Sequence, residues 1–304
     1  MSIESVTTPR APGAMDTVLT WLYAPGDRPE VVAKALRSGA DVVLVDLEDA
    51  VAPDRKDYAR AATAELLAQR AAGPAAIHVR INAIGTRHAA ADLAALAALP
   101  GLGGLRLPKV AAPSDIADVV RQVRARADGE AGHEFAVPGL YPLLESALGI
   151  ENAFAVATAD PAVRGIALGE ADLKADLGMS DENALAWPRA RVVVAARAAG
   201  LAPPAQSVYP HVRDLAGLAE SCARGRALGF LGRTAIHPRQ LPVIERAYLP
   251  TAVEVAAARE TVAAAQTDAG ALALPDGRFV DAAVVAGARR TLALADRAAA
   301  PRHG

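Results

Sequence analysis

Short apolar runs alternate with longer alanine-rich segments along almost the entire chain. The apolar runs have the length of buried strands and lie between turn residues, whereas the alanine-rich segments have the length and composition of helices. Strands are predicted at residues 18–24, 41–46, 75–81, 104–108, 139–144, 163–168, 205–208 and 232–236. Helices are predicted between them at residues 28–38, 54–72, 89–99, 113–127, 150–159, 182–199, 214–228 and 238–248.

This alternation predicts an α/β fold. Eight strand–helix repeats in about 250 residues match a (β/α)8 TIM barrel in both number and size. An open doubly wound sheet is the competing architecture, but it usually has fewer strands and a glycine-rich phosphate loop after the first one. The first turn here, PGDRP at residues 25–29, lacks that glycine pattern. We therefore predict a barrel over residues 17–250.

Segments at both ends lie outside the predicted barrel. Residues 1–16 are rich in Ser, Thr and Pro and contain no long apolar core, which predicts a flexible N-terminal arm rather than a signal peptide. Residues 251–304 contain two further predicted helices, at 251–266 and 281–298, joined by a loop. This helical extension is too short for a separate domain, so we expect it to act as a lid or arm.

Composition narrows the functional class. Hydrophobic residues make up 52% of the chain but aromatic residues only 4%, which predicts a large aliphatic core. The net charge of −2 provides no basic surface for nucleic acid or for an anionic membrane, and no apolar run is long enough to span a bilayer. The single cysteine, Cys222, excludes an internal disulfide and a cysteine metal cluster. These features favour a cytoplasmic protein.

Polar side chains gather at the predicted carboxyl ends of the strands, where the active site of a barrel lies. Glu145 and Asp172 follow two consecutive strands, so their carboxylates can converge on one divalent cation such as Mg²⁺. Each could instead be a helix N-terminal acid stabilised by the helix dipole. Arg80 suits bidentate capture of a carboxylate, and its presence favours the metal–carboxylate interpretation. Further strand-end positions are Asp46, Glu48, His78, Asn82, Lys109, Gln206, Ser207 and His237.

Several of these positions also have a purely structural interpretation. Asp46 is expected to form an ion pair with Arg28, Arg80 or Lys109, whereas Glu48 is equally compatible with such an ion pair and with a catalytic role. Lys109 can form a Schiff base with a carbonyl substrate, but neutralisation of the acids after the second strand is favoured. His237 precedes a proline at a strand end, where a structural role is favoured.

Short motifs at these strand ends identify a resemblance that extends from residue 22 to about residue 298. The chain resembles the citrate lyase β-subunit-like branch of the HpcH/HpaI aldolase superfamily. Each motif alone has little specificity, but their order along the chain is specific. They are LYAPG at 22–26, DLEDAV at 46–51, VRIN at 79–82, LPK at 107–109, ESALG at 145–149 with NA at 152–153, GEADL at 169–173 and AIHP at 235–238.

The resemblance implies a barrel enzyme that makes or breaks a carbon–carbon bond in a 3-hydroxyacyl thioester. The thioester is usually a coenzyme A ester, of the malyl-CoA or citramalyl-CoA type, and the other product is a keto acid. The resemblance implies that Glu145 and Asp172 bind Mg²⁺, for which Mn²⁺ can substitute.

The same resemblance implies roles for the surrounding residues. Arg80 would hold the keto-acid end of the substrate, and Asp46 and Glu48 would orient Arg80 and the waters around the metal. The substrate carboxylate would bind to backbone amides at Gly169, Glu170 and Ala171.

The C-terminal extension carries the motif DGRFVD at residues 276–281, which resembles a segment of longer family members. The resemblance implies that Asp281 reaches the active site of a neighbouring subunit and acts there as an acid/base. It therefore also implies a homo-oligomer, either a trimer or a pair of trimers. The structural alternative is that Asp281 caps the last helix.

Two departures from the family pattern lie on the thioester side of the predicted mouth. Leu19 and Thr20 stand where relatives often have Arg-Ser, and QSVYPH at 206–211 replaces an aspartate-containing turn. The sequence therefore does not determine the identity of the acyl group. Three alternative functions also fit the sequence. These are a malyl-CoA-type thioesterase, a β-subunit of a multi-subunit citrate lyase, and a metal-free aldolase that uses Lys109.

Overall fold

The computed structural model describes residues 17–69, 73–127, 136–267, 272–273 and 279–299. The predicted N-terminal arm, residues 1–16, lies outside the described residues. The chain divides into two compact units, Met1–Ile244 and Glu245–Gly304.

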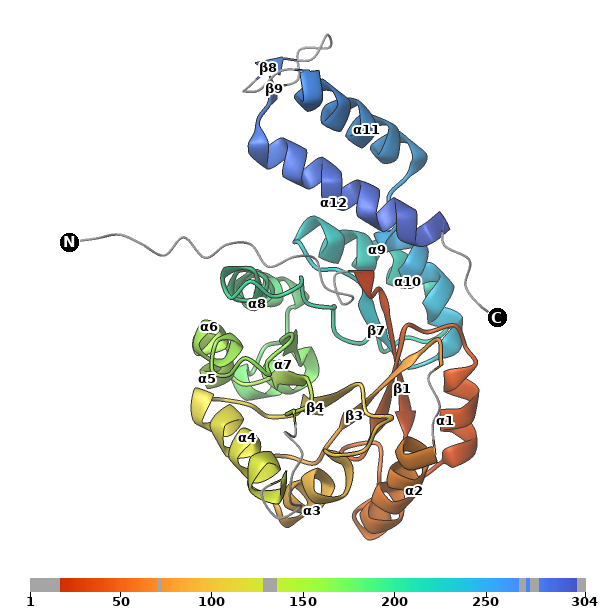
Figure 1. The fold of residues 1–304 in the computed structure, drawn as a ribbon, viewed down its shortest axis with the longest axis vertical. Helices are drawn as coiled ribbons and strands as arrows, with labels where there is room; N and C mark the ends of the chain where they lie inside the picture. The colour runs from red at the N-terminus through yellow and green to blue at the C-terminus, as the bar shows by residue number, and fades with distance from the viewer. Residues whose placement is uncertain (1–16, 70–72, 128–135, 268–271, 274–278, 300–304) are drawn as a thin grey trace, which may run out of the picture. The chain divides into compact units, whose positions relative to one another are not determined.

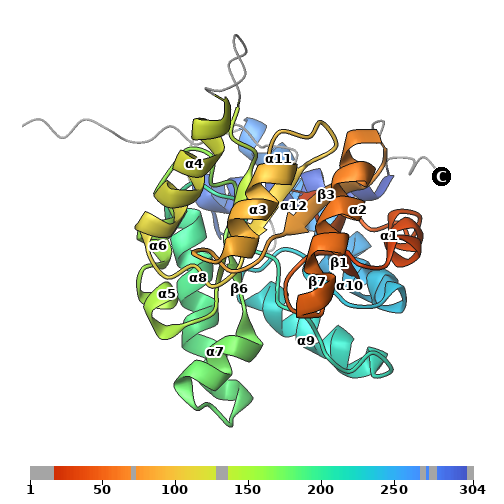
Figure 2. The same cartoon turned by 90° about the horizontal axis from the view of Figure 1, so that it is seen from below.

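The first unit is built around a parallel sheet, which the helices surround (Figures 1 and 2). Its described residues form seven strands in the order β6-β5-β4-β3-β2-β1-β7, and every strand pair is parallel. Parallel pairing requires a crossover between successive strands, which the helical segments supply. The strands are β1 Thr20–Pro25, β2 Val42–Asp46, β3 Ala76–Arg80, β4 Gly104–Leu107, β5 Leu140–Leu144, β6 Ala167–Leu168 and β7 Arg233–Ala235.

Strand β2 illustrates why the apolar runs form strands. Its sequence VVLVD is buried at every position, as expected for a parallel strand that is covered on both faces. The carboxyl end of β2 pairs with that of β3, and Asp46 lies opposite Arg80. The register of the sheet therefore places these two predicted site residues side by side.

The α/β class and the TIM-like curled parallel sheet are confirmed, but one predicted strand is almost absent. Within residues 205–208, the described pairing is a single bridge between Gln206 and Arg233. Pro203 and Pro204 precede this segment and Pro210 follows it, and proline lacks the N–H group that a ladder requires. Among the described residues, no ladder joins this segment to β6, so the sheet has a seam there.

The helices of the first unit follow the predicted alternation, with small differences. The helix predicted at 150–159 is split into two short helices, and the turn after β6 leads directly into another helix, α7. The helices are α1 Pro29–Leu36, α2 Lys56–Gln69, α3 Arg87–Leu96, α4 Pro113–Ala127, α5 Ala147–Glu151, α6 Ala153–Ala157, α7 Glu170–Leu177, α8 Ala186–Ala198, α9 Leu215–Ala227 and α10 Leu241–Tyr248.

The second unit contains two packed helices, α11 Ala252–Thr267 and α12 Ala282–Ala299. Between them, β8 Leu272–Ala273 pairs antiparallel with β9 Phe279–Val280, where the sequence predicted only a loop. Residues 276–278 of the DGRFVD motif lie outside the described residues. No helix in the described part of the chain is long and apolar enough to cross a membrane.

Candidate active site

Arg80 is the centre of an ion-pair cluster at the carboxyl end of the sheet. Its Nε and Nη2 donate to the two carboxylate oxygens of Asp46 at 2.7 and 2.6 Å. Burial opposes the charge of Arg80, but the hydrogen bonds to Asp46 outweigh it and raise the pKa of the guanidinium. The predicted pairing of Asp46 with Arg80 is therefore present. Asp46 also accepts hydrogen bonds from the backbone N–H groups of Glu48 and Ala50, which fixes the loop after β2.

Glu48 connects this cluster to the end of β4. One carboxylate oxygen lies 3.1 Å from Nη1 of Arg80, and the other lies 3.1 Å from Nζ of Lys109. Burial raises the pKa of Glu48 despite the two neighbouring cations. Asp49 adds a third carboxylate, 3.3 Å from Nη1 of Arg80. Asp49 belongs to the same DLED run but was not among the predicted site residues.

Lys109 directs its backbone toward Glu145. It is the one described non-glycine residue with a positive φ, 55°, a conformation that costs a non-glycine residue about 1–2 kcal/mol. In this conformation its N–H donates to Oε1 of Glu145 at 2.6 Å, while its side chain pairs with Glu48. Local strain of this kind is frequent at functional sites.

Glu145 is a buried carboxyl group, 5% exposed, at the end of β5. Burial raises its pKa to about 7, although the hydrogen bond from Lys109 opposes this shift; the negative charges of Asp172 and Glu48 raise the pKa further. The group therefore resists ionisation until a cation compensates its charge. A divalent cation bound between Glu145 and Asp172 would supply that compensation.

Gly169 lies against the carboxylate of Glu145. A Cβ atom at this position would lie 2.5 Å from Oε2 of Glu145, so the close approach requires glycine. Helix α7 begins at the next residue without a side-chain cap. The N–H groups of its first turn are therefore available to an anion, and Asp172 stands exposed in this same turn.

The side chain of Glu170 is not available to a substrate, because Arg189 holds it. Nε and Nη2 of Arg189 donate to both oxygens of Glu170 at 2.7 Å each, and Arg189 also pairs with Glu182. Glu170 can therefore contribute only its backbone N–H. Arg189 anchors the first turn of α7, and no local pattern in the sequence predicts this pairing across 19 positions.

The acidic pair fits the donor set that Mg²⁺ prefers. Mg²⁺ commonly binds to one or two carboxylates and takes its remaining ligands from water and substrate. In the described part of the chain, no group of three or more His, Cys, Asp or Glu side chains could hold a metal ion. Two hard oxygen donors, Glu145 and Asp172, beside an arginine and a helix N-terminus suit Mg²⁺ or Mn²⁺ better than a softer metal.

Other predicted strand-end residues have structural roles. The ring of His78 is buried between Trp21 and Tyr141, and Asn82 donates to Asp92. Gln206 donates to the carbonyl of Ser221 in α9, and the ring of His237 accepts a hydrogen bond from the N–H of Arg239. None of these contacts brings the side chain to the Arg80 cluster, and the structural interpretation of His237 stays a prediction.

Asp281 lies in the second unit, at the start of α12. Its Oδ1 accepts a hydrogen bond from the N–H of Val284 at 2.9 Å, so the structural alternative, a helix N-cap, is present. One cap hydrogen bond occupies one of the two carboxylate oxygens. The acid/base role remains a prediction.

Comparison with known proteins identifies the family of this chain. A family model described as HpcH/HpaI aldolase/citrate lyase matches residues 19–238, which include both acids and the Arg80 cluster. The chain belongs to this family. It is therefore a lyase-like enzyme of the HpcH/HpaI aldolase family, in the citrate lyase β-subunit-like branch.

Relatives in this family have different named activities. Citrate lyase subunit beta from Leuconostoc mesenteroides subsp. cremoris is 32% identical over 91% of this chain and 93% of its own length. A (3S)-malyl-CoA thioesterase from Cereibacter sphaeroides (strain ATCC 17029) is 34% identical over 92% and 95%. The crystal structure of CitE from Mycobacterium tuberculosis with magnesium, acetoacetate and coenzyme A has a TM-score of 0.75 at 33% identity, and covers 92% of this chain and 99% of its own.

The Gly169–Glu145 contact leads to a first prediction. Gly169→Ala should displace the Glu145 side chain, because the added methyl group would lie 2.5 Å from Oε2 and 2.6 Å from Cβ of Glu145. We expect stability to fall by about 1–3 kcal/mol and Mg²⁺ affinity to fall at least about tenfold, measured by denaturation and calorimetry. Gly287→Ala is the control, because its nearest neighbour would be a flexible arginine end at 3.7 Å. Unchanged affinity in Gly169→Ala would contradict the assigned metal site.

Proposed function

We propose that this enzyme is a Mg²⁺-dependent carbon–carbon lyase that acts on a 3-hydroxyacyl-CoA of the malyl-CoA or citramalyl-CoA type. The products would be a keto acid and an acyl-CoA. The observation that carries the proposal is Glu145, a buried carboxylate with a raised pKa beside the charge of Asp172. An acidic pair in this state favours a divalent cation.

Glu145 and Asp172 would hold the metal, with water and substrate oxygens as its other ligands. When bound, Mg²⁺ or Mn²⁺ supplies a Lewis acid that stabilises negative charge on the substrate oxygen. The chain itself contributes the guanidinium of Arg80. Asp46 holds this group rigidly, and its charge favours the same oxyanion.

The keto-acid carboxylate would bind at the start of α7. Its uncapped N–H groups, at Glu170 and Ala171 after Gly169, form an anion site of the kind that helix N-termini provide. Arg189 supports this arrangement because it fixes the Glu170 side chain. In this proposal Glu48 orients Arg80 and the waters near the metal, since it contacts both Arg80 and Lys109.

In the cleavage direction, a water molecule would act as the base that accepts the proton of the substrate hydroxyl, and the carbon–carbon bond would break. The bonding electron pair passes to the thioester fragment as an enolate, and the hydroxyl carbon becomes the keto carbon. Asp281 of a neighbouring subunit would then donate a proton to the enolate carbon. The proposal therefore includes a homo-oligomer, a trimer or a hexamer, in which the extension of one subunit completes another subunit's site.

The charge state of Lys109 argues against the Schiff-base alternative. A Schiff-base lysine must lose its proton before it attacks a carbonyl. Burial lowers the pKa of Lys109, but its hydrogen bond to Glu48 and the surrounding acids outweigh this, so the pKa is raised overall. Lys109 therefore suits the supporting role.

A thioesterase is the second candidate, because one similar relative is a (3S)-malyl-CoA thioesterase. In that reaction water attacks the thioester carbonyl, and the products are free CoA and the intact hydroxy acid. Citrate lyase subunit beta supports a third candidate, a subunit of a larger lyase. Purification together with other lyase subunits would favour that third candidate.

One experiment distinguishes the first two candidates. The enzyme is incubated with Mg²⁺ and a panel of 3-hydroxyacyl-CoA esters, and the products are identified by mass. A keto acid together with a shortened acyl-CoA supports the lyase, whereas hydroxy acid and free CoA support the thioesterase. Absence of both product sets across malyl-CoA and citramalyl-CoA would contradict the proposed substrate class.

Arg80 provides a second prediction. Arg80→Lys retains the positive charge but loses the two-point contact with Asp46, since lysine has no planar fork. We expect kcat/KM to fall on the order of 10²-fold, with the fold preserved by circular dichroism. Arg121→Lys is the matched control, because Arg121 is an exposed partner of Asp118 on α4. Equal kcat/KM in Arg80→Lys and the control would show that Arg80 takes no part in the reaction.

A further inference from the structure

A second polar feature lies inside the first unit, at the opposite ends of the strands. A cavity of about 30 Å³ opens at the seam between β6 and the segment around Gln206. It is lined by residues before or early in the strands, including Val18, Trp21, Tyr141, Ala167, Pro204 and Leu231. None of the residues that line it is Glu145, Asp172 or a member of the Arg80 cluster.

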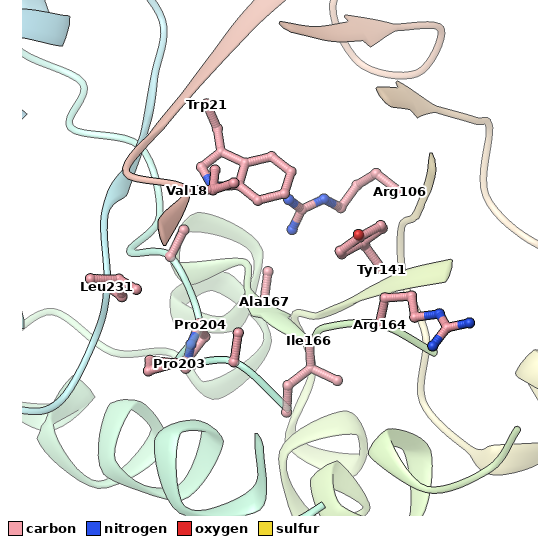
Figure 3. A pocket seen from close by; sticks show the side chains of 12 residues that line it. Val18, Trp21, Arg106, Tyr141, Arg164, Ile166, Ala167, Pro203, Pro204 and Leu231 are labelled. Atoms are coloured by element: carbon pink, nitrogen blue, oxygen red, sulfur yellow. The ribbon is translucent and has the colours of Figure 1, made fainter. Parts of the chain in front are cut away.

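Arg106 of β4 projects into this cavity, and its guanidinium lies between Trp21 and Tyr141 (Figure 3). The residue is only 4% exposed. Its Nε is buried without a hydrogen-bond partner among the described residues. The cavity lining includes no described Asp or Glu, so no carboxylate of the lining pairs with Arg106. Burial lowers the pKa of Arg106, and the negative charge of Glu145, which does not line the cavity, opposes that shift only in part.

Burial of a guanidinium without an ion-pair partner costs free energy, and proteins normally avoid it. The ring of Trp21 offsets part of the cost, with the guanidinium carbon 5.1 Å from its centroid. The neighbouring His78 provides no negative charge, because burial and then the charge of Arg106 lower its pKa to about 3 and leave it neutral. Nδ1 of His78 is also buried without a partner in the described structure. The cavity therefore combines the positive charge of Arg106 with an Nε that has no hydrogen-bond partner among the described residues.

We propose that this cavity binds a small monovalent inorganic anion of halide size, held by the guanidinium of Arg106. The volume supports a small occupant, because about 30 Å³ is only roughly two to three times the ~10–15 Å³ that a single water molecule needs. A phosphate or a substrate carboxylate with its carbon chain is larger. Arg164 also lines the cavity, but its guanidinium points away from the other lining side chains (Figure 3), so Arg106 is the anion ligand.

Thermal unfolding of the full-length enzyme tests this site. The melting temperature is measured in sodium gluconate, chloride and bromide at one fixed ionic strength. A ligand that binds only the folded state stabilises it, so we expect the halides to raise the melting temperature by on the order of 1–3 °C. Arg106→Met should abolish the difference between halide and gluconate. Arg164→Met is the matched control and should retain the difference.

Crystals of the unmodified enzyme in bromide provide a test that does not depend on folding of a variant. We expect an anomalous bromide peak within hydrogen-bond distance of the Arg106 guanidinium. A water molecule in the cavity without an anomalous peak would overturn the proposal. The same halide stabilisation in Arg106→Met and in the unmodified enzyme would overturn it as well.

Discussion

Replacement of Asp281 by asparagine should reduce kcat by roughly 10²–10⁴-fold, the usual contribution of a general acid/base. Asparagine caps helices about as well as aspartate, so the hydrogen bond from the N–H of Val284 should persist. The variant removes the ionisable group and retains the cap. We expect Mg²⁺ affinity and the melting temperature to match those of the unmodified enzyme, measured by calorimetry and thermal unfolding.

Asp281→Ala separates the two roles of this residue. Alanine removes both the acid and the cap, so kcat should fall as in Asp281→Asn, and stability should fall by about 1 kcal/mol in addition. If Asp281 were only a cap, Asp281→Asn would turn over normally and only Asp281→Ala would be impaired. That pattern would exclude the acid/base role.

Mixed subunits test whether Asp281 acts across subunits. An Asp281→Asn subunit retains an intact metal site, and a Glu145→Gln subunit retains an intact Asp281. Each variant alone should be inactive. If sites are shared, joint refolding of the two variants should restore activity, because some mixed oligomers contain one complete site. No recovery from verified mixed oligomers would place Asp281 in its own subunit's site or outside the reaction.

Glu145→Gln should weaken Mg²⁺ binding by at least about 10²-fold, because a neutral amide replaces one of two carboxylate ligands. Turnover should fall with it and recover only partly at high Mg²⁺. Calorimetric titration measures the affinity. Glu151→Gln is the matched control, since Glu151 is an exposed acid on the adjacent helix α5. Undiminished affinity in Glu145→Gln would contradict the two-carboxylate site.

The pKa of Glu145 also predicts how stability depends on pH in the presence of EDTA. The folded protein retains the Glu145 proton up to about pH 7, whereas an ordinary glutamate releases it near 4.5. The unfolded chain therefore binds fewer protons between these pH values, and the free energy of unfolding falls as pH rises through this window. The Glu145 contribution is fully present below pH 4.5 and lost by about pH 7, on the order of 3 kcal/mol.

Denaturation curves measured from pH 4.5 to 8 in EDTA test this linkage. Because Glu48 also has a raised pKa, the share of Glu145 is the difference between the unmodified enzyme and Glu145→Gln. Metal binding must displace the same proton, so Mg²⁺ affinity should increase with pH, by up to about tenfold per unit, and level off above pH 7. Identical pH profiles for both proteins would show that Glu145 ionises normally.

The sequence alone determined the α/β architecture and limited the expected partners of Asp46 to three basic residues, of which the structure shows Arg80. Hydrophobic patterning is a local property, and a run such as VVLVD has the short length and β-branched composition of a buried strand. Parallel strands end at one edge, so residues that follow consecutive strands converge there. This rule predicted the Arg80 cluster with Glu48 and Lys109, although it overlooked Asp49. The same rule overestimated segment 205–208, where flanking prolines limit strand pairing to one bridge.

Only the tertiary structure determined the properties that depend on distant neighbours. The raised pKa of Glu145 results from burial by residues far along the chain, and the need for glycine at position 169 results from the approach of that same carboxylate. The left-handed conformation of Lys109 has no counterpart in residue type, since lysine does not favour it. The sequence places Arg106 in a strand, and only the tertiary packing shows that its guanidinium is buried and that its Nε has no hydrogen-bond partner among the described residues. Desolvation and close contact depend on three-dimensional packing, which composition and spacing do not encode directly.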